Sequence, residues 1–150
     1  MIAYAENNLR RAPITIHNFD EMKKKYQNVS RNSLSTYEKG ISSEFCASKL
    51  LISKGYKILH FRMRNMYGEI DIIAQKNDVI VAVEVKQRKT LDSSKESITY
   101  RQKRRISEAF LLFISERNEM FETYRIDVVC FDSNGRFEHI ENAFYIEEAA

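Results

Sequence analysis

The most constraining feature of this sequence is a pair of alternating segments on either side of Asn77-Asp78. Residues 69–76 and 79–88 each alternate between apolar and other side chains, which is typical of strands in a partly buried sheet. Asn and Asp favour the tight turns that join such strands. We therefore expect a β-hairpin in which Lys76 pairs with Val79, so that the numbers of directly opposed residues sum to 155.

This register places two acids opposite each other, Asp71 on the first strand and Glu84 on the second. Like charges in that position destabilise a sheet, so a cation, a shared proton or exposure to solvent should offset the repulsion. Lys86 points to the same face as Glu84 and would lie opposite Glu69. Carboxylates suit Mg²⁺ or Mn²⁺, and a metal beside a lysine can activate water and stabilise a phosphoryl-like transition state. An ordinary solvated Glu-Lys pair is the alternative.

A third acid lies in the helix that we expect over residues 35–54. Ser35 and Glu38 have the spacing of a capping box, and Gly55 can adopt the left-handed conformation that ends a helix. At about 100° per residue, Glu44 falls inside the apolar stripe of this helix. Its carboxylate must therefore reach solvent, find a cation or ionise at a large desolvation cost. A shared pocket with the two strand acids would explain its position.

The remaining pattern predicts one mixed sheet with helices. Further strands are expected at residues 56–64, 125–131 and 136–140. Residues 90–97 are polar and indicate a loop, and Thr99 with Gln102 forms a second capping box. The order helix, three strands, helix, two strands predicts an α/β or α+β domain over residues 35–150. Residues 1–34 are expected to be an N-terminal extension, poorly ordered or with a short helix.

Strict alternation also predicts which side chains share a face. In the first strand it places Leu59, Phe61 and Met63 on one face and His60, Arg62 and Arg64 on the other. In the hairpin it places Ile70, Ile72 and Ala74 on the face of Val81, Val83 and Val85.

Composition limits the function. The 150 residues contain only two cysteines, which indicates a reducing cytoplasm rather than a disulfide scaffold. No apolar run approaches the ~18 residues of a membrane span, and no apolar signal core begins the chain. The net charge of +3 permits a nucleic-acid partner without requiring one. The candidate contacts to a phosphate backbone are Arg88, Lys89, Arg101, Lys103, Arg104 and Arg105. The alternative is a solvated helical face.

The hairpin sequence resembles a known family. Residues 68–74 (GEIDIIA) and 83–88 (VEVKQR) closely resemble the signature of the YraN family, small and largely uncharacterised bacterial proteins that are expected to be endonuclease-like. The resemblance includes Gly40, Glu44, Ala47, Leu51, Arg62 and residues 55–59, 125–129 and 142–144. It spans about residues 38–145. This family is similar to the PD-(D/E)XK nucleases, which include archaeal Holliday-junction resolvases and restriction enzymes.

The resemblance implies a restriction-endonuclease-like fold and metal-dependent hydrolysis of phosphodiester bonds, in DNA above all. It implies that Asp71 and Glu84 bind Mg²⁺ or Mn²⁺, that Glu44 is a further, water-mediated ligand, and that Lys86 orients or helps to deprotonate the attacking water. A two-fold dimer would suit resolvase-like action. Two features depart from the family pattern: residues 1–34 have no counterpart, and Gln102 occupies the usual place of a lysine, with Lys103 next to it.

Two other functions fit the same residues. The chain could be a nucleic-acid-binding module on a nuclease fold with little or no hydrolysis. It could also be a protein-interaction domain whose acidic pocket is vestigial. Elsewhere, Arg125 and Asp127 share a strand face, and we expect them to form a structural pair.

Overall fold

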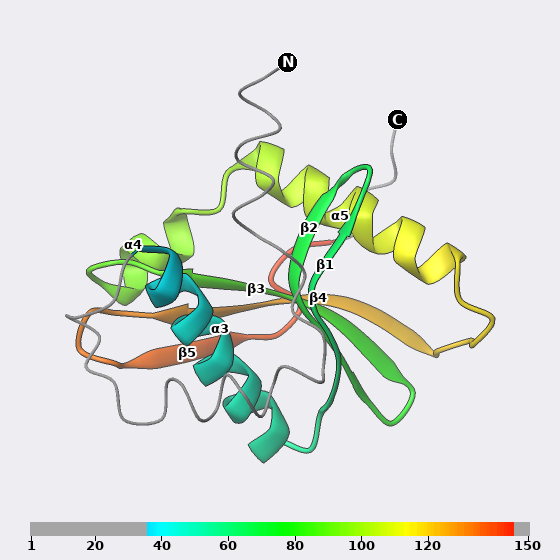
Figure 1. Ribbon diagram of the computed structural model, residues 1–150, viewed down its shortest axis with the longest axis horizontal. Helices are drawn as coiled ribbons and strands as arrows, with labels where there is room; N and C mark the ends of the chain where they lie inside the picture. The colour runs from blue at the N-terminus through cyan, green and yellow to red at the C-terminus, as the bar shows by residue number, and fades with distance from the viewer. Residues whose placement is uncertain (1–35, 146–150) are drawn as a thin grey trace.

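The computed structural model describes residues 36–145, in which one five-stranded sheet lies between helices (Figure 1). The helices are α3 (Thr36–Ser53), α4 (Leu91–Glu96) and α5 (Tyr100–Ser115). The strands are β1 (Lys57–Asn65), β2 (Gly68–Lys76), β3 (Val79–Gln87), β4 (Thr123–Phe131) and β5 (Phe137–Ile140). They lie in the order β1-β2-β3-β4-β5, and β3 and β4 are the parallel pair. The predicted α/β class with a mixed sheet is confirmed.

Each face of the sheet has its own core. On one face, Ala47 and Leu51 of α3 pack against Ile72, Val81 and other strand residues. On the opposite face, Ala109 and Phe110 of α5 pack against the other set of strand side chains. The predicted extension at residues 1–34 and the cap at Ser35 lie outside the described residues. None of the helices within residues 36–145 is both long and apolar enough to cross a lipid bilayer.

The predicted end of the first helix is confirmed in detail. Gly55 has a φ of +91°, in the left-handed region that favours glycine. Its N–H donates to the carbonyl of Ile52 at 3.0 Å, and the N–H of Tyr56 donates to that of Leu51 at 3.0 Å. These two hydrogen bonds form a Schellman motif, which satisfies the last carbonyls of α3 and turns the chain into β1.

The hairpin has the predicted register, from Lys76 opposite Val79 to Ile72 opposite Val83. The ladder between β2 and β3 stops there, one pair before the two acids would face each other. Beyond this point β3 stays paired with β4 as far as Gln87, whereas β2 stays paired with β1. The β1–β2 hairpin runs at a steep angle to β3 and β4, so the two halves of the sheet diverge (Figure 1). We call this divergence the fork.

Strict alternation is wrong at two places. In β1, Leu59 and Met63 contact the core beneath α5, and His60 makes an edge-to-face contact with Phe113 of that helix. Phe61, by contrast, lies in the core beneath α3. A β-bulge between Ile58 and His60 and a positive φ of 49° at Arg62 cause this exchange of faces. In β2, Ile70 belongs to the α5 core and Ile72 to the α3 core, because the strand leaves the ladder between them.

The loop predicted for residues 90–97 is also wrong, because residues 91–96 form α4. Thr90 and Ser93 make a reciprocal capping box that the polar composition concealed. The buried hydroxyl of Ser94 donates to the carbonyl of Phe131 at 2.8 Å. This hydrogen bond holds α4 against the end of β4.

Candidate active site

The two opposed acids meet at the fork. Asp71 accepts a hydrogen bond from the backbone N–H of Val85 at 2.9 Å, in place of a ladder bond. Its carboxyl group is a close neighbour of that of Glu84, and both line the same cavity. Burial raises the pKa of both groups, and the charge of Asp71 raises that of Glu84 further. The raised pKa values therefore favour protonation of one acid when no metal is bound, which is one of the three ways expected to offset the repulsion.

Lys86 is the cation of this pair. Its Nζ lies 3.0 Å from Oε1 of Glu84, and both side chains are largely buried. The positive charge lowers the pKa of both acids and so opposes the effect of burial. Lys86 does not lie opposite Glu69, as strict pairing predicted. Glu69 instead forms an ion pair of 2.6 Å with Arg64, its neighbour across the β1–β2 ladder, because β2 carries it away from β3.

Glu44 finds a cation, one of the outcomes expected for an acid in an apolar stripe. Nε and Nη2 of Arg62 donate to its two carboxylate oxygens at 2.8 and 3.0 Å. Both residues are buried, and the bidentate geometry compensates the charges. Burial and the nearby Asp71 raise the pKa of Glu44, while the guanidinium opposes them. Arg62 was not among the predicted site residues, although an acid in an apolar stripe requires a nearby cation.

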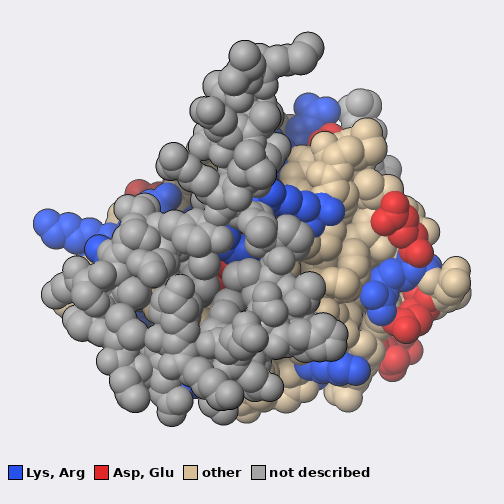
Figure 2. Space-filling view, in the orientation of Figure 1, with Lys and Arg blue, Asp and Glu red and all other residues tan. Residues whose placement is uncertain are grey.

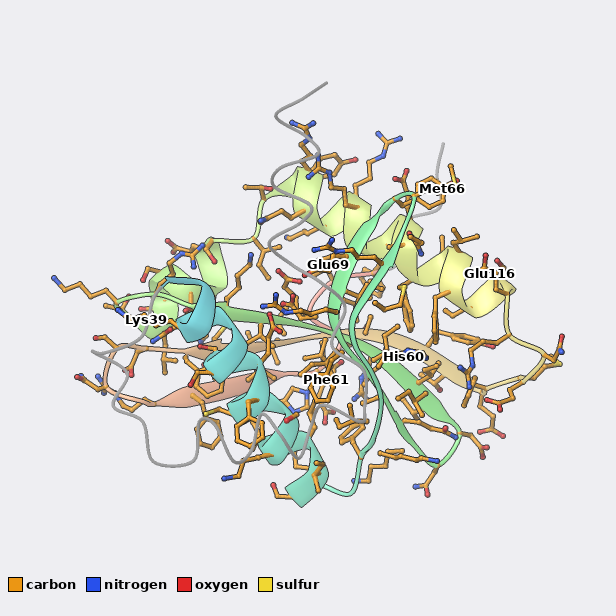
Figure 3. The ribbon with its side chains drawn as sticks, in the orientation of Figure 1. Lys39, His60, Phe61, Met66, Glu69 and Glu116 are labelled. Carbon is orange, nitrogen blue, oxygen red and sulfur yellow. The ribbon has the colours of Figure 1, made fainter. Side chains whose placement is uncertain are left out.

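A single cavity of about 440 Å³ brings the four predicted catalytic residues together. Its lining includes Glu44, Asp71, Glu84 and Lys86, together with Arg62, Arg88 and Gln102. A second cavity of about 180 Å³ shares Asp71, Glu84 and Gln102 with the first. It continues between the hairpin and α5 along Gly68, Glu69 and Arg105. In Figure 3, Glu69 lies on the hairpin between the tip at Met66 and the middle of the sheet.

The donors in the first cavity fit a hard divalent cation. Mg²⁺ commonly binds through one or two carboxylates and completes its shell with water and phosphate oxygens. Asp71 and Glu84 supply that pair, and a cation between them would compensate their negative charges. Glu44 fits less well as a direct ligand because Arg62 occupies both of its oxygens. In residues 36–145, no three His, Cys, Asp or Glu side chains form a preformed metal cluster.

The six predicted backbone contacts do not all lie in one place. Arg88 lines the first cavity and Arg105 the second, while Lys89, Arg101 and Arg104 are exposed. Lys103 lies over the ring of Phe144, with Nζ 5.6 Å from its centroid. In Figure 2, Lys and Arg are spread over several parts of the visible face, and most of the visible Asp and Glu lie at its right-hand edge beside further Lys and Arg.

Sequence comparison assigns the chain to a family. The pattern of the uncharacterised protein family UPF0102 matches residues 43–131, which include the two acids, Lys86 and Arg62. The chain belongs to the UPF0102 family. This confirms the resemblance to the YraN proteins.

Several UPF0102 proteins are similar over most of this chain. The UPF0102 protein of Sulfurihydrogenibium sp. strain YO3AOP1 is 46% identical over 112 residues, 73% of this chain and 96% of that protein. That of Azorhizobium caulinodans is 34% identical over 118 residues, 78% and 90% of the two chains. That of Syntrophomonas wolfei is 36% identical over 112 residues, 71% and 97% of the two chains.

A second buried ionic cluster lies at the other end of α3. Arg125 makes a bidentate pair with Asp127 at 2.7 and 2.9 Å, which confirms the predicted structural pairing. Asp127 also bonds Nε2 of His139 at 2.8 Å, and Arg125 donates to the hydroxyl of Tyr56 at 2.6 Å. These contacts join β4 to β5 and to the start of β1.

Proposed function

We propose that this UPF0102 protein is a nuclease that depends on Mg²⁺ or Mn²⁺ and hydrolyses phosphodiester bonds of nucleic acid. One observation carries the proposal: two desolvated acids and a lysine amine converge in a single cavity, where the ladder between β2 and β3 ends. An acid pair of this kind is unfavourable for folding alone. Its position is explained if a divalent cation and a phosphate bind there.

Each residue then has a distinct role. The carboxylates of Asp71 and Glu84 would hold the cation, which when bound stabilises charge on a phosphate oxygen and acidifies water. Lys86 is held 3.0 Å from Glu84 and would orient the attacking water by donating a hydrogen bond to it, while its positive charge favours loss of the water's proton to solvent. Arg62 fixes Glu44 at the wall of the cavity, where Glu44 can contact the site through water.

DNA is the proposed substrate and the cytoplasm the proposed location. Arg88 and Arg105 lie at the two cavities and would bind phosphates on either side of the cut, while Lys89, Arg101 and Arg104 would extend the contact. The likeness of the family to PD-(D/E)XK nucleases and the order of helices and strands support the same activity. A homodimer would present two such sites to the two strands of a duplex.

The test is a cleavage screen over duplex, single-stranded and branched DNA and RNA with Mn²⁺. Wild type is expected to cut at least one class of substrate, and Asp71→Asn and Lys86→Ala to lose at least about 100-fold of the rate, as is usual for residues that assist at the reacting centre. Lys57→Ala, an exposed lysine on β1, is the matched control and should cut like wild type. Unchanged cleavage by Asp71→Asn would refute the assignment.

A nucleic-acid-binding module is the second candidate. The observation that favours it is the bidentate ion pair between Arg62 and Glu44. Because Arg62 occupies both carboxylate oxygens of Glu44, two rather than three acids remain for a metal. Gln102 lines the cavity in the usual place of a lysine, so the cavity also lacks the positive charge that this lysine would supply. Tight binding of DNA by wild type without cleavage in either Mg²⁺ or Mn²⁺ would decide for this module.

A further inference from the structure

The tip of the β1–β2 hairpin holds two apolar side chains out toward solvent. Met66 is 82% exposed and Tyr67 is 42% exposed (Figure 3 shows Met66 at the tip). The tip is braced rather than loose. Asn65 accepts from the N–H of Tyr67 at 3.0 Å and donates to the carbonyl of Ala109 in α5 at 2.9 Å. Exposing two apolar side chains to water on a fixed turn is energetically unfavourable, so a binding role would explain their position.

A shallow apolar depression of about 270 Å³ lies beside the tip. It is lined by Tyr67, Leu111, Leu112, Ser115 and Glu108. A flat apolar group that entered it would contact Tyr67 on one side and the two leucines on the other. A nucleobase has this shape, and base–aromatic stacking tolerates any sequence because every base has a π-face.

The tip is connected to the acids. The second cavity runs from Asp71 and Glu84 past Glu69 to Gly68 and Arg105. A side-chain carbon added at Gly68 would lie 3.6 Å from Cβ of Arg105, so the hairpin rests closely against α5 here. Tyr67 lies in the turn just before β2 and is four residues from Asp71, which corresponds to at most about 13 Å of extended chain.

The charge around the tip favours nucleic acid as the occupant. The first two turns of α5 carry Arg101, Arg104 and Arg105 on the exposed side, and no acid precedes Glu108 in that helix. Glu108 is itself paired with Arg104, at 3.2 Å. Apolar side chains that reach bases beside cations on the backbone are the usual elements of proteins that bind unstacked nucleic acid.

We propose that Met66 and Tyr67 form a base-contacting tip that binds unpaired nucleotides up to about four positions from the phosphate that a cation at Asp71 and Glu84 would bind. The upper limit follows from the chain, since stacked nucleotides advance ~3.4 Å each and at most ~13 Å separates Tyr67 from Asp71. This inference rests on the proposed function for the position of the phosphate. It assigns as substrate a duplex with an adjoining unpaired segment.

The experiment measures binding by fluorescence anisotropy in EDTA, where no cleavage occurs. The probes are a labelled 20-base-pair duplex and the same duplex with six unpaired nucleotides at one end. Wild type is expected to bind the tailed duplex about tenfold more tightly, the range that stacking of one or two bases gives. The double variant Met66→Ala, Tyr67→Ala should lose this preference while it binds the plain duplex like wild type.

Two controls separate the tip from general effects. Met120→Ala removes another exposed methionine, 92% exposed against 82% for Met66, and should keep the full preference. Tyr67→Phe retains the aromatic ring and should keep most of the preference for the tailed duplex. The thermal midpoint of each variant reports whether the variant is folded.

The outcomes are distinguishable. A wild type that cuts or binds nucleic acid but does not prefer the tailed duplex overturns the tip and leaves the nuclease proposal standing. A double variant with an unchanged preference also overturns the tip. A wild type that binds no nucleic acid overturns both proposals. Dissociation of a dimer in the double variant, with the preference unchanged, would instead make the tip a contact between copies of the chain.

Discussion

Replacing Asp71 by Asn should stabilise the metal-free protein, although the residue is buried and hydrogen-bonded. The amide oxygen of Asn can still accept from the N–H of Val85, and the amide nitrogen can donate to Glu84. The ion pair between Glu84 and Lys86 remains. The substitution therefore removes one of two like charges and keeps the hydrogen bonds around it.

Coulomb's law gives an order of magnitude for the expected gain. Two like unit charges at about 4 Å repel by about 4 kcal/mol at the effective dielectric constant that suits protein sites. Lys86 attracts both acids and offsets much of this repulsion. A net gain of about 1–2 kcal/mol at pH 8 follows, which would raise the thermal midpoint of a chain of this size by roughly 3–6 °C.

The gain should depend on pH in a defined direction. Burial raises the pKa of Asp71 and Glu84 in the folded state, whereas both ionise near pH 4 in the unfolded chain. Above pH 4 the folded state therefore holds more protons than the unfolded state, and its stability falls as the pH rises. The advantage of Asp71→Asn should be near zero at pH 4 and grow toward pH 8.

Urea denaturation in EDTA at several pH values measures the effect, with Asp92→Asn as an exposed control that should change stability by less than about 0.5 kcal/mol. Mn²⁺ provides a second reading, since a ligand at 100 times its dissociation constant stabilises wild type by about 2.7 kcal/mol. Asp71→Asn should lose most of that gain. A variant that is less stable than wild type by more than about 1 kcal/mol at pH 8 in EDTA would refute the repelling pair.

Three further substitutions test other parts of the structure by chemical denaturation. Arg62→Met should lower the free energy of unfolding by about 3–5 kcal/mol because it leaves Glu44 buried without its cation. Adding Glu44→Gln should restore part of this stability, and additive losses in the double variant would contradict the pairing. Asp127→Asn should cost about 3 kcal/mol at pH 7. Burial alone would raise the pKa of Asp127, but its hydrogen bonds hold it below the usual value, so this cost should disappear below pH 4, and a cost unaffected by pH would count against the cluster. Thr99→Ala should cost about 1 kcal/mol through the lost cap of α5, and no change would mean that the cap is redundant.

The parts of the fold that depend on neighbouring residues were predictable from sequence. The turn at Asn77 fixed the hairpin register, and Gly55 marked the end of α3, because both are set by backbone conformations that few residues adopt. The capping box at Thr99 is equally local. The convergence of the acids followed from the register together with the helical stripe that contains Glu44.

The parts that depend on an irregularity were not predictable. The bulge before His60 and the left-handed conformation of Arg62 change which side chains of β1 lie on each face of the sheet. No residue type in that strand predicts either irregularity. The pairing of Lys86 with Glu84 rather than Glu69 follows from the departure of β2 from the ladder. A period of two residues assumes an unbroken strand and therefore fails where strands separate.

The fork can carry unfavourable charge because β3 is secured on its other side. Glu84 lies opposite Val128 in the parallel ladder with β4, and that pairing continues through Lys86 to Gln87. The backbone of β3 thus keeps its hydrogen bonds on that side after β2 has left, and Asp71 satisfies the N–H of Val85 on the open side. The sheet can therefore open at the two acids with the N–H of Val85 still satisfied. An acid pair placed in the middle of the β2–β3 ladder would have no such space for a cation and a phosphate.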